Sequence, residues 1–342
     1  MLAAVYYNNH DVRIEEMPVP EIADDEILLK VMASGICGSD LTEWYRVPKA
    51  PRVLGHEATG VIAKAGANVT RYKVGDRVFV SHHVPCNKCC YCLRGHHTAC
   101  ETLHTTNFYP GGFAQYVRVP KINVEQGVYR LPDDMSFEEG TFIEPLACVV
   151  RGQRLAALEK DDTLLIIGGG LAGNLHAQLA RANGVRNVVV SGMNQYRLEL
   201  TKKFGAHHTI DARLNVPQEL KKLNVGRLAD QVFICKGGVS AALTAMECVD
   251  KGGTILFFAV SDPTVKIPVP MTEFWRNEIT LKTSYGASPR DLEESLAVLS
   301  QKKLNVVDMI THRFGIRKAA EGFSLMAKSG NSLKVIIEPN RD

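Results

Sequence analysis

The chain has 342 residues, which is enough for two domains of ordinary size. Its 40 basic and 37 acidic residues give a formal net charge of +3, without the clustered basic stripe that binding to nucleic acid or an anionic membrane needs. No apolar run reaches the roughly 20 residues that span a bilayer, and residues 1–16 lack the regions of a secretory signal, so we expect a cytoplasmic protein.

Residues 1–150 predict a β-rich, barrel-like domain. Short apolar stretches such as residues 27–31 and 77–80 are separated by turn sequences at residues 74–76 and 110–112. Short strands that recur at this spacing between turns are typical of all-β domains.

Four of the nine cysteines, Cys86, Cys89, Cys92 and Cys100, lie in one short loop. An odd number of cysteines in a chain with ample core argues against a disulfide framework, so metal ligation is the better interpretation. Four thiolates complete a tetrahedron and leave no position for water, which predicts a structural zinc site. An iron–sulfur cluster is the alternative, because thiolates alone do not identify the metal. Cys90 breaks the spacing and is expected to be a bystander.

From residue 151 the pattern changes to apolar runs that alternate with helical periodicity. The runs at residues 164–167, 187–192 and 231–235 are separated by segments such as residues 195–204. This alternation predicts βαβ units on a parallel sheet with helices on both faces, which is the doubly wound α/β class. Two helices and a last strand are expected after it, at residues 289–301, 316–328 and 333–339.

A glycine-rich loop stands between a predicted strand and a predicted helix. Residues 164–167 run directly into Gly168-Gly169-Gly170-Leu171-Ala172-Gly173, which matches G-x-G-x-x-G. Gly168 permits the tight turn, Gly170 leaves room for a pyrophosphate, and Gly173 lets the helix pack on the strand, while the helix N-terminus faces the phosphates. The loop therefore predicts dinucleotide binding, and a glycine-rich turn of another α/β protein is the alternative.

The end of the next strand bears on which dinucleotide binds. NAD-binding folds usually carry a carboxylate there, about 20 residues after the loop, for the adenosine ribose. Residues 190–197 hold no carboxylate, and Gly192 stands at the strand end. Ser191, Asn194 and Arg197 could instead offer donors and positive charge to a 2′-phosphate. The sequence thus favours NADP over NAD, with Arg197 as a surface residue and either cofactor accepted as the alternative.

Cys37, His56, Glu57 and Glu144 are candidates for a second metal site. Thiolates, imidazoles and carboxylates are all zinc ligands. Each residue also has an ordinary structural interpretation, as a small core residue, a satisfied polar group or the partner of a lysine. Their positions in the sequence alone do not unite them.

The motifs together resemble the medium-chain zinc-dependent alcohol dehydrogenase family, and within it the polyol branch that includes sorbitol, galactitol-phosphate and threonine dehydrogenases. The resemblance covers nearly the whole chain. It is carried in order by Cys37-Gly38-Ser39-Asp40, Gly55-His56-Glu57, Gly75-Asp76-Arg77-Val78, the four-cysteine loop, Glu144-Pro145-Leu146 and the loop at residues 168–173.

The resemblance implies the domain organisation. A GroES-like β-rich catalytic domain would comprise residues 1–150 and 285–342, and a Rossmann dinucleotide-binding domain would comprise residues 151–284. Members of this family are commonly oligomers, so a homodimer or homotetramer is expected. The apolar run at residues 253–260 is the candidate edge for pairing between sheets.

The resemblance also implies catalytic roles. Cys37 and His56 would hold a catalytic zinc, with Glu144 as third ligand and Glu57 as an alternative or exchanging ligand, beside the structural zinc of the cysteine loop. A zinc with one open position lowers the pKa of a bound alcohol, whose alkoxide then transfers a hydride to the nicotinamide of NAD(P). Ser39 would pass the alcohol proton toward solvent, unless it only begins a helix.

The expected substrate is a small secondary alcohol of a polyol or sugar, or its ketone. Trp44 and Tyr45 are candidates for the pocket wall, and Arg151 or Arg154 for a contact with an anionic substrate group. Lys236 is a candidate for a contact with the cofactor. Two other classes are the alternatives: a zinc-free quinone or enone reductase, and a non-catalytic zinc-stabilised sensor of nucleotides or oxidants.

Overall fold

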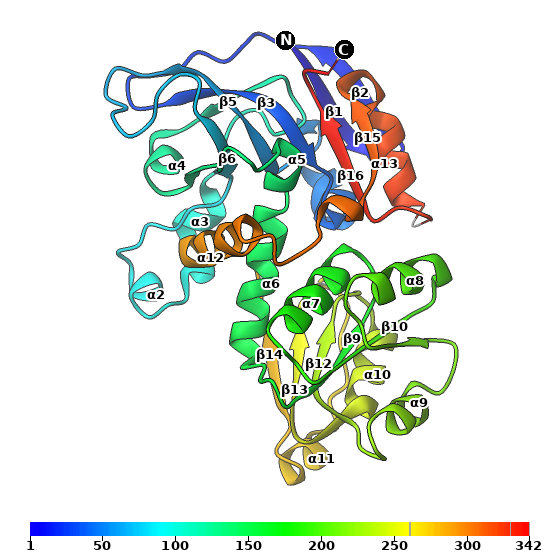
Figure 1. Cartoon of the computed structure of the whole chain (residues 1–342). Coiled ribbons are helices and arrows are strands. Elements are labelled where there is room, and N and C mark those ends of the chain that lie inside the picture. Colours follow the sequence, from blue (N-terminus) through cyan, green and yellow to red (C-terminus); the bar gives the residue numbers. More distant parts are fainter. Residues whose placement is uncertain (260, 329, 342) are drawn as a thin grey trace. The chain divides into compact units, whose positions relative to one another are not determined.

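The computed structural model describes residues 1–259, 261–328 and 330–341 (Figure 1). The chain forms two compact units. The first unit comprises Met1–Ala147, Ala287–Lys302 and Val306–Asp342, and the second comprises Cys148–Gly286 and Lys303–Asn305. The first unit is therefore built from two distant parts of the sequence. None of the described helices is long and apolar enough to cross a membrane.

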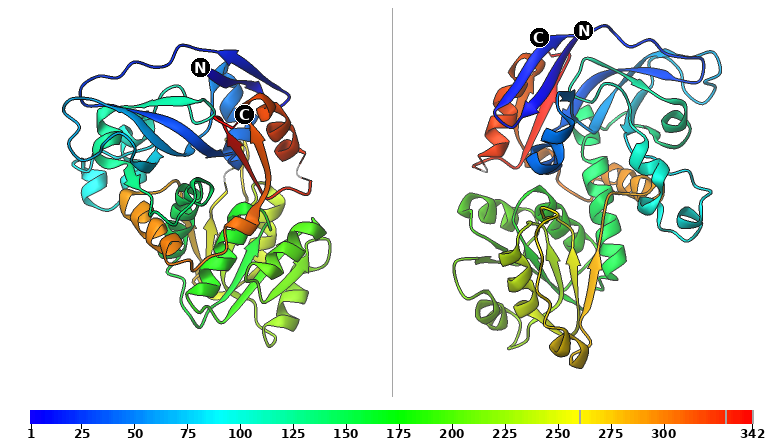
Figure 2. Two further views of the ribbon diagram at one scale, coloured as in Figure 1. Left: turned by 45° about the horizontal axis from the view of Figure 1, so that its top comes forward. Right: turned by 180° about the vertical axis from the view of Figure 1, so that it is seen from behind.

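Antiparallel strands dominate the first unit, so the predicted β-rich domain is confirmed (Figure 2). A seven-stranded sheet has the order β15-β16-β3-β5-β6-β8 with β7 paired to β3, and a three-stranded sheet has the order β2-β1-β4. The strands are β1 (Leu2–Asn8), β2 (Asp11–Glu16), β3 (Ile27–Gly35), β4 (Arg52–Val53), β5 (Glu57–Ala65), β6 (Arg77–Ser81), β7 (Tyr116–Val119), β8 (Val128–Arg130), β15 (Ile310–Gly315) and β16 (Lys334–Glu338).

The central strand β3 shows why this sheet forms. Ile27, Leu29 and Val31 alternate along it and are buried in one apolar core, as the two-residue period of a strand requires. Strand β16 joins β3 on one side, and β5 joins it on the other. The helices of this unit are α1 (Glu43–Arg46), α2 (Cys90–Leu93), α3 (Glu101–Thr105), α4 (Lys121–Gln126), α5 (Phe137–Gly140), α12 (Pro289–Ser300) and α13 (Ala319–Ala327), and α6 (Ile143–Ala156) runs on into the second unit.

The second unit is a doubly wound parallel sheet, as predicted. Its strand order is β11-β10-β9-β12-β13-β14. All strands are parallel, and the order in which the chain adds them changes side between β9 and β12. The strands are β9 (Thr163–Ile167), β10 (Asn187–Gly192), β11 (His208–Asp211), β12 (Ala229–Ile234), β13 (Val249–Phe257) and β14 (Thr280–Thr283). The helices are α7 (Leu171–Ala182), α8 (Gln195–Lys203), α9 (Val216–Leu223), α10 (Val239–Cys248) and α11 (Met271–Arg276).

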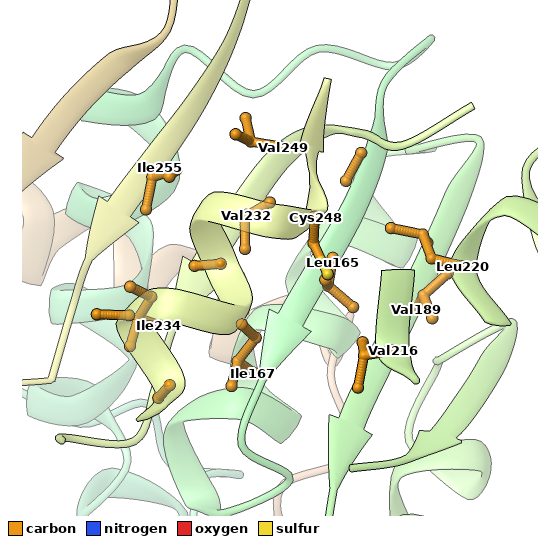
Figure 3. Close-up of a cluster of buried hydrophobic side chains, with 14 of the residues drawn as sticks. Leu165, Ile167, Val189, Val216, Leu220, Val232, Ile234, Cys248, Val249 and Ile255 are labelled. Carbon is orange, nitrogen blue, oxygen red and sulfur yellow. The ribbon is translucent and has the colours of Figure 1, made fainter. Parts of the chain in front are cut away.

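Apolar side chains cover both faces of this sheet. On one face, Leu165 and Val232 pack against Leu220 of α9 and Cys248 of α10 (Figure 3). On the other face, Leu164 and Ile166 pack against residues of α6 and α7. The strands are buried on both sides, which explains why they read as continuous apolar runs rather than as alternating ones.

The expected pairing edge at residues 253–260 was wrong. Residues 253–257 belong to β13, which lies between β12 and β14 in the described sheet, and residue 260 lies outside the described residues. The edge strand on this side is β14, a short strand with three of its four residues exposed. The apolar run is therefore interior, since it is hydrogen-bonded on both sides.

Candidate active site

The pairing of β3 with β5 brings three candidate ligands together. Glu57 pairs with Gly35 across the two strands, so the turn that follows β3, with Cys37, lies beside the residue that precedes β5, His56. The ligand atoms of Cys37, His56 and Glu57 all lie within 4.8 Å of one another. A thiol, an imidazole and a carboxylate at this separation are a donor set that suits zinc.

Glu57 also forms an ion pair with Lys334 of β16. Both side chains are fully buried, and the ammonium Nζ contacts the carboxylate Oε2. The strands that carry them flank β3, and a side chain at Gly35 would overlap both groups, so the glycine makes room for the pair. The second carboxylate oxygen, Oε1, is buried and has no hydrogen-bond partner. A buried acceptor without a donor is costly, and a cation is one group that would satisfy it.

Asp40 orients His56. Its Oδ1 lies 3.3 Å from His56 Nδ1, and its Oδ2 accepts a hydrogen bond from the backbone N–H of Cys37 at 3.1 Å. Burial alone would lower the pKa of His56, but Asp40 and Cys37 raise that pKa well above its ordinary value. The carboxylate thus fixes the imidazole through Nδ1 and leaves Nε2 for a ligand, the arrangement found behind metal-binding histidines.

Arg46 contacts both Asp40 and Ser39. Its guanidinium donates to the backbone oxygen of Ser39 at 2.9 Å and to the Ser39 hydroxyl at 3.2 Å, and it lies 3.4 Å from Asp40 Oδ1. Ser39 is exposed and lies inside a short turn, Gly38–Leu41, whose N-cap is Cys37. Ser39 therefore lies in the first turn of this short 3₁₀-helix, although the N-cap residue itself is Cys37.

Glu144 is not a member of the group formed by Cys37, His56 and Glu57. It lies in the first turn of α6 and is half-buried. Two residues earlier, the ring of Phe142 lies 5.3 Å from Lys334 Nζ, so the start of α6 contacts the cation that pairs with Glu57.

His82 lies beside His56, which the sequence did not suggest. The two ring centroids are 4.8 Å apart, because His82 follows Ser81, the residue that pairs with Glu57 across β5 and β6. Burial is the main cause that lowers the pKa of His82 well below its ordinary value. Its proximity to His56 depends on the register of two strands, for which the sequence gave no sign.

The four predicted cysteines form a second group. The sulfurs of Cys86, Cys89, Cys92 and Cys100 lie within 4.8 Å of one another, with Cys89 and Cys92 at 3.5 Å and Cys86 and Cys100 at 3.6 Å. Backbone N–H groups point at these sulfurs and are the main cause that lowers the pKa of Cys86. Cys90 is exposed and is not part of the group. The lobe is a compact cage of four thiol ligands.

The glycine loop has the shape that a dinucleotide requires. Gly168 has a φ of 113°, a left-handed value that favours glycine, and a side chain at Gly173 would overlap the Gly168 carbonyl. The loop is held by Asn174, whose amide nitrogen donates to the carbonyls of Gly169 and Gly170 at 3.0 and 2.9 Å. The sequence analysis did not predict this role of Asn174. The only sign of it in the sequence is that Asn174 directly follows the glycine motif.

One buried polar atom at the end of β10 and one in the first turn of α8 have no hydrogen-bond partner. The hydroxyl of Ser191 and Nε of Arg197 are both buried and unpaired, and burial lowers the pKa of Arg197. The side chain of Asn194 caps α8 by accepting the N–H of Arg197 at 3.1 Å. Gly192 pairs with Asp211 of β11, whose carboxylate is held by the guanidinium of the neighbouring residue 213.

The remaining candidates are scattered over both units. Trp44 and Tyr45 are 39% and 37% exposed, with their ring centroids 5.8 Å apart. In the second unit, Arg151 is buried and Arg154 is exposed. Lys236 is exposed just after β12. A Cβ atom placed on Gly168 would lie 3.2 Å from the Cβ of Lys236, so Lys236 lies beside the glycine loop.

Residues 23–133 match the alcohol dehydrogenase GroES-like domain, and residues 172–301 match the zinc-binding dehydrogenase family. Sorbitol dehydrogenase of Mus musculus is 33% identical over 350 residues, which cover 99% of this chain and 96% of that protein. The first match contains Cys37, His56 and the four-cysteine lobe, and the second covers most of the parallel-sheet unit, from within α7 onward.

Two solved structures have the same fold. A zinc-binding dehydrogenase from Sinorhizobium meliloti 1021, bound to NADP, superposes with a TM-score of 0.88 at 25% identity, and 99% of each chain is covered. An alcohol dehydrogenase from Escherichia coli CFT073, complexed with NADH, superposes with a TM-score of 0.88 at 26% identity and the same coverage. The chain therefore belongs to the medium-chain zinc-dependent alcohol dehydrogenase family, in its polyol branch, and is an oxidoreductase that uses a nicotinamide dinucleotide.

Proposed function

We propose that this enzyme oxidises a secondary alcohol of a polyol or sugar to the ketone, and catalyses the reverse reduction, with one zinc at Cys37 and His56. The observation that carries the proposal is the group of Cys37, His56 and Glu57 at the meeting point of β3 and β5. The reaction transfers a hydride from the alcohol carbon to the nicotinamide ring, which is thereby reduced. The proton of the alcohol hydroxyl is released.

The residues fit a catalytic zinc. Cys37 and His56 supply two ligands, and the unpartnered Glu57 Oε1 supplies an oxygen in the same group. Lys334 already holds Oε2, which makes Glu57 a weaker ligand than a free carboxylate, so Glu144 and Glu57 are both candidates for the third position. Bound zinc supplies a Lewis acid that favours loss of the substrate hydroxyl proton.

The protein side chains position the substrate proton for removal. The Ser39 hydroxyl accepts a hydrogen bond from Arg46, which leaves its own hydrogen and one lone pair for other partners. It can therefore accept the alcohol proton while donating to water, since Ser39 is exposed. Asp40 keeps the imidazole of His56 in one orientation throughout. These contacts support a proton relay from the substrate through Ser39 to solvent.

The dinucleotide would lie on the loop Gly168–Gly173, with the N-terminus of α7 toward its pyrophosphate. In this proposal NADP is preferred over NAD, because Ser191 Oγ in β10 and Arg197 Nε in α8 are two buried donors without partners. A 2′-phosphate would satisfy both. The nearby carboxylate of Asp211 is neutralised by Arg213, so it does not oppose a phosphate.

A second zinc, with a structural role, would lie in the lobe of Cys86, Cys89, Cys92 and Cys100. The proposed metal content is therefore two zincs per chain. The four sulfurs leave no carboxylate or imidazole in the cage, so no exchangeable position is expected.

We also propose a homodimer through strand β14. In the described sheet, β14 pairs only with β13, and an exposed strand edge is a template for pairing with a second chain. Beside it lies an apolar hollow of about 370 Å³ with exposed Met271 and Trp275. Trp275→Glu should shift the sedimentation of the protein to that of a monomer, whereas Val225→Glu, at another exposed apolar residue, should not.

The deciding experiment combines elemental analysis with turnover of a panel of polyols. The wild type should contain two zincs, and Cys37→Ala or His56→Ala should retain one and lose at least about a thousandfold in kcat/KM, because the Lewis acid is lost. The exposed Cys90→Ala is the matched control and should retain both zincs and full activity. Full activity of Cys37→Ala would contradict the catalytic assignment. Glu57→Gln and Glu144→Gln, compared for zinc content, identify the third ligand.

A further inference from the structure

We propose that Tyr45, Arg46, Lys49 and Arg52 form a subsite for an anionic group, phosphate or carboxylate, on the alcohol substrate. We call these four residues the basic subsite. The inference rests on the proposed function, since it names the class of substrate that the same site would take.

The basic subsite is built around one aromatic ring. Lys49 Nζ lies 3.6 Å from the centroid of the Tyr45 ring, and the guanidinium carbon of Arg46 lies 4.8 Å from it. Arg46 and Lys49 are three residues apart on consecutive helical turns, Glu43–Arg46 and Val47–Lys49, so their side chains emerge on the same side. Arg52 follows at the start of β4.

The charges of this segment are not balanced. Asp40 is already committed to His56 and to the Cys37 N–H, and Glu43 accepts the backbone N–H of Asn9. In the part of the chain that the structure describes, no carboxylate oxygen lies within 4.0 Å of a side-chain nitrogen of Lys49 or Arg52. Lys49 and Arg52 therefore have no carboxylate partner among the described residues, and Lys49 shares the Tyr45 ring with Arg46.

The excess of positive charge changes the pKa of the Tyr45 hydroxyl. Burial alone would raise the pKa of Tyr45, but the neighbouring Lys49, followed by Arg46 and Arg52, lowers that pKa below 10. A site that favours a phenolate also favours an anionic ligand. The phenol hydroxyl and the three cations offer donors of the kind that phosphate and carboxylate groups accept.

A chain of contacts leads from the basic subsite to the proposed reaction centre. Arg46 donates to the hydroxyl of Ser39 at 3.2 Å, and Ser39 is two residues from Cys37. Arg46 also lies 3.4 Å from Asp40, which orients His56. An alcohol whose hydroxyl meets Ser39 can therefore place an anionic group a few bonds away against Tyr45 and Lys49.

The first test measures anion binding without turnover. The chain has two tryptophans, and Trp44 lies against Tyr45, so a Trp275→Phe protein reports on the subsite by fluorescence. Inorganic phosphate and acetate are titrated separately. We expect saturable binding of at least one, weakened on the order of 10–100-fold in Lys49→Gln/Arg52→Gln, because each charged hydrogen bond contributes severalfold or more. Lys64→Gln, an exposed lysine of β5, should bind as the parent protein does. Absence of saturation by both anions would overturn the subsite.

The second test assigns the anion to the substrate. The ratio of kcat/KM for a phosphorylated or carboxylated polyol to that for its neutral parent should exceed about ten, and the double variant should reduce it toward one. Phosphorylated and carboxylated compounds tested side by side distinguish the two anions. A ratio near one in the wild type would overturn the inference.

The cofactor is the other possible source of the anion. The dissociation constant of NADPH should be the same in the wild type and in Lys49→Gln/Arg52→Gln. If it rises while the substrate ratio stays constant, the subsite serves the dinucleotide and the assignment to the substrate is wrong. If no alcohol is turned over at all, the proposed function fails, and the fluorescence titration still decides whether the anion site exists.

Discussion

The ammonium of Lys334 meets the carboxylate of Glu57 in the interior of the first unit, although 277 residues separate them in the chain. Neither side chain is accessible to water. Desolvation of both charges is costly, and their attraction offsets that cost only while both partners are present. The pair therefore links the proposed zinc site at Cys37 and His56 to a strand from the other end of the sequence.

Removing one partner of this pair should destabilise the first unit strongly. In the zinc-free protein, Lys334→Met leaves the Glu57 carboxylate buried and uncompensated, which should lower the free energy of unfolding by about 3–5 kcal/mol. The double variant Glu57→Gln/Lys334→Met removes both charges and should recover most of that loss. Urea unfolding in a Trp275→Phe background, followed by Trp44 fluorescence, measures both losses. Lys64→Met is the exposed control and is expected within about 0.5 kcal/mol of the parent protein. Equal losses in the single and double variants would show that the charge is not the cause.

Cys92 and Cys90 are two residues apart but should behave differently. Cys92 is 5% exposed and belongs to the sulfur cage, whereas Cys90 is exposed and lies outside it. Cys92→Ser should remove about one zinc per chain and make the lobe at residues 86–100 sensitive to protease, because metal binding and local folding are coupled. Cys90→Ser should keep both zincs. Retention of two zincs by Cys92→Ser would rule out the four-sulfur site.

Arg197 should decide between the two dinucleotides. Arg197→Leu removes a buried donor from the proposed 2′-phosphate site, so the dissociation constant of NADPH should rise on the order of 10–100-fold while that of NADH changes little. Gly192→Asp should move the preference in the same direction by repulsion. Lys202→Leu, on the same helix α8 and exposed, is the control. Parallel weakening of both cofactors would point to a general effect on folding.

His176 should make the second unit less stable in mild acid. It is buried between Phe233 and Phe258, and burial lowers its pKa from 6.5 to about 3. Between these values the unfolded state binds a proton that the folded state does not, so the free energy of unfolding falls as pH falls from 6.5 toward 3. The loss at pH 4.5 should be about 2–3 kcal/mol.

Calorimetry of His176→Leu checks this sign. The variant should be less sensitive than wild type to a change from pH 7 to pH 4.5, by about the same 2–3 kcal/mol. His208→Leu, at an exposed histidine of β11, should retain the wild-type dependence. Identical slopes for His176→Leu and wild type would show that the buried imidazole is not responsible.

Local motifs were predicted well from the sequence because their geometry is contained in a few consecutive residues. The loop Gly168–Gly173 lies between β9 and α7, and the cysteine lobe brings its own four ligands together. The helices at α8 and α12 begin at Gln195 and Pro289, where the periodicity predicted them. In each case neighbouring residues decide the conformation.

The features that were missed depend on pairing between distant strands. Lys334 was predicted to lie in the last strand, but nothing near it in the sequence names Glu57 as its partner. The candidate edge at residues 253–260 was wrong because a highly apolar strand is buried on both sides, while the edge strand beside it, β14, is short and exposed. Contacts that depend on which residues pair between distant strands could therefore not be predicted from the sequence.

The position of Lys334 has a consequence during synthesis of the protein. A ribosome that has just produced Glu57 must add 277 more residues before the charge of that carboxylate is matched. Strand β16, which carries Lys334 and pairs with β3, emerges after the whole nucleotide-binding unit. The whole parallel sheet is thus synthesised before β16, so the group of Cys37, His56 and Glu57 gains the buried partner of Glu57 only when β16 emerges.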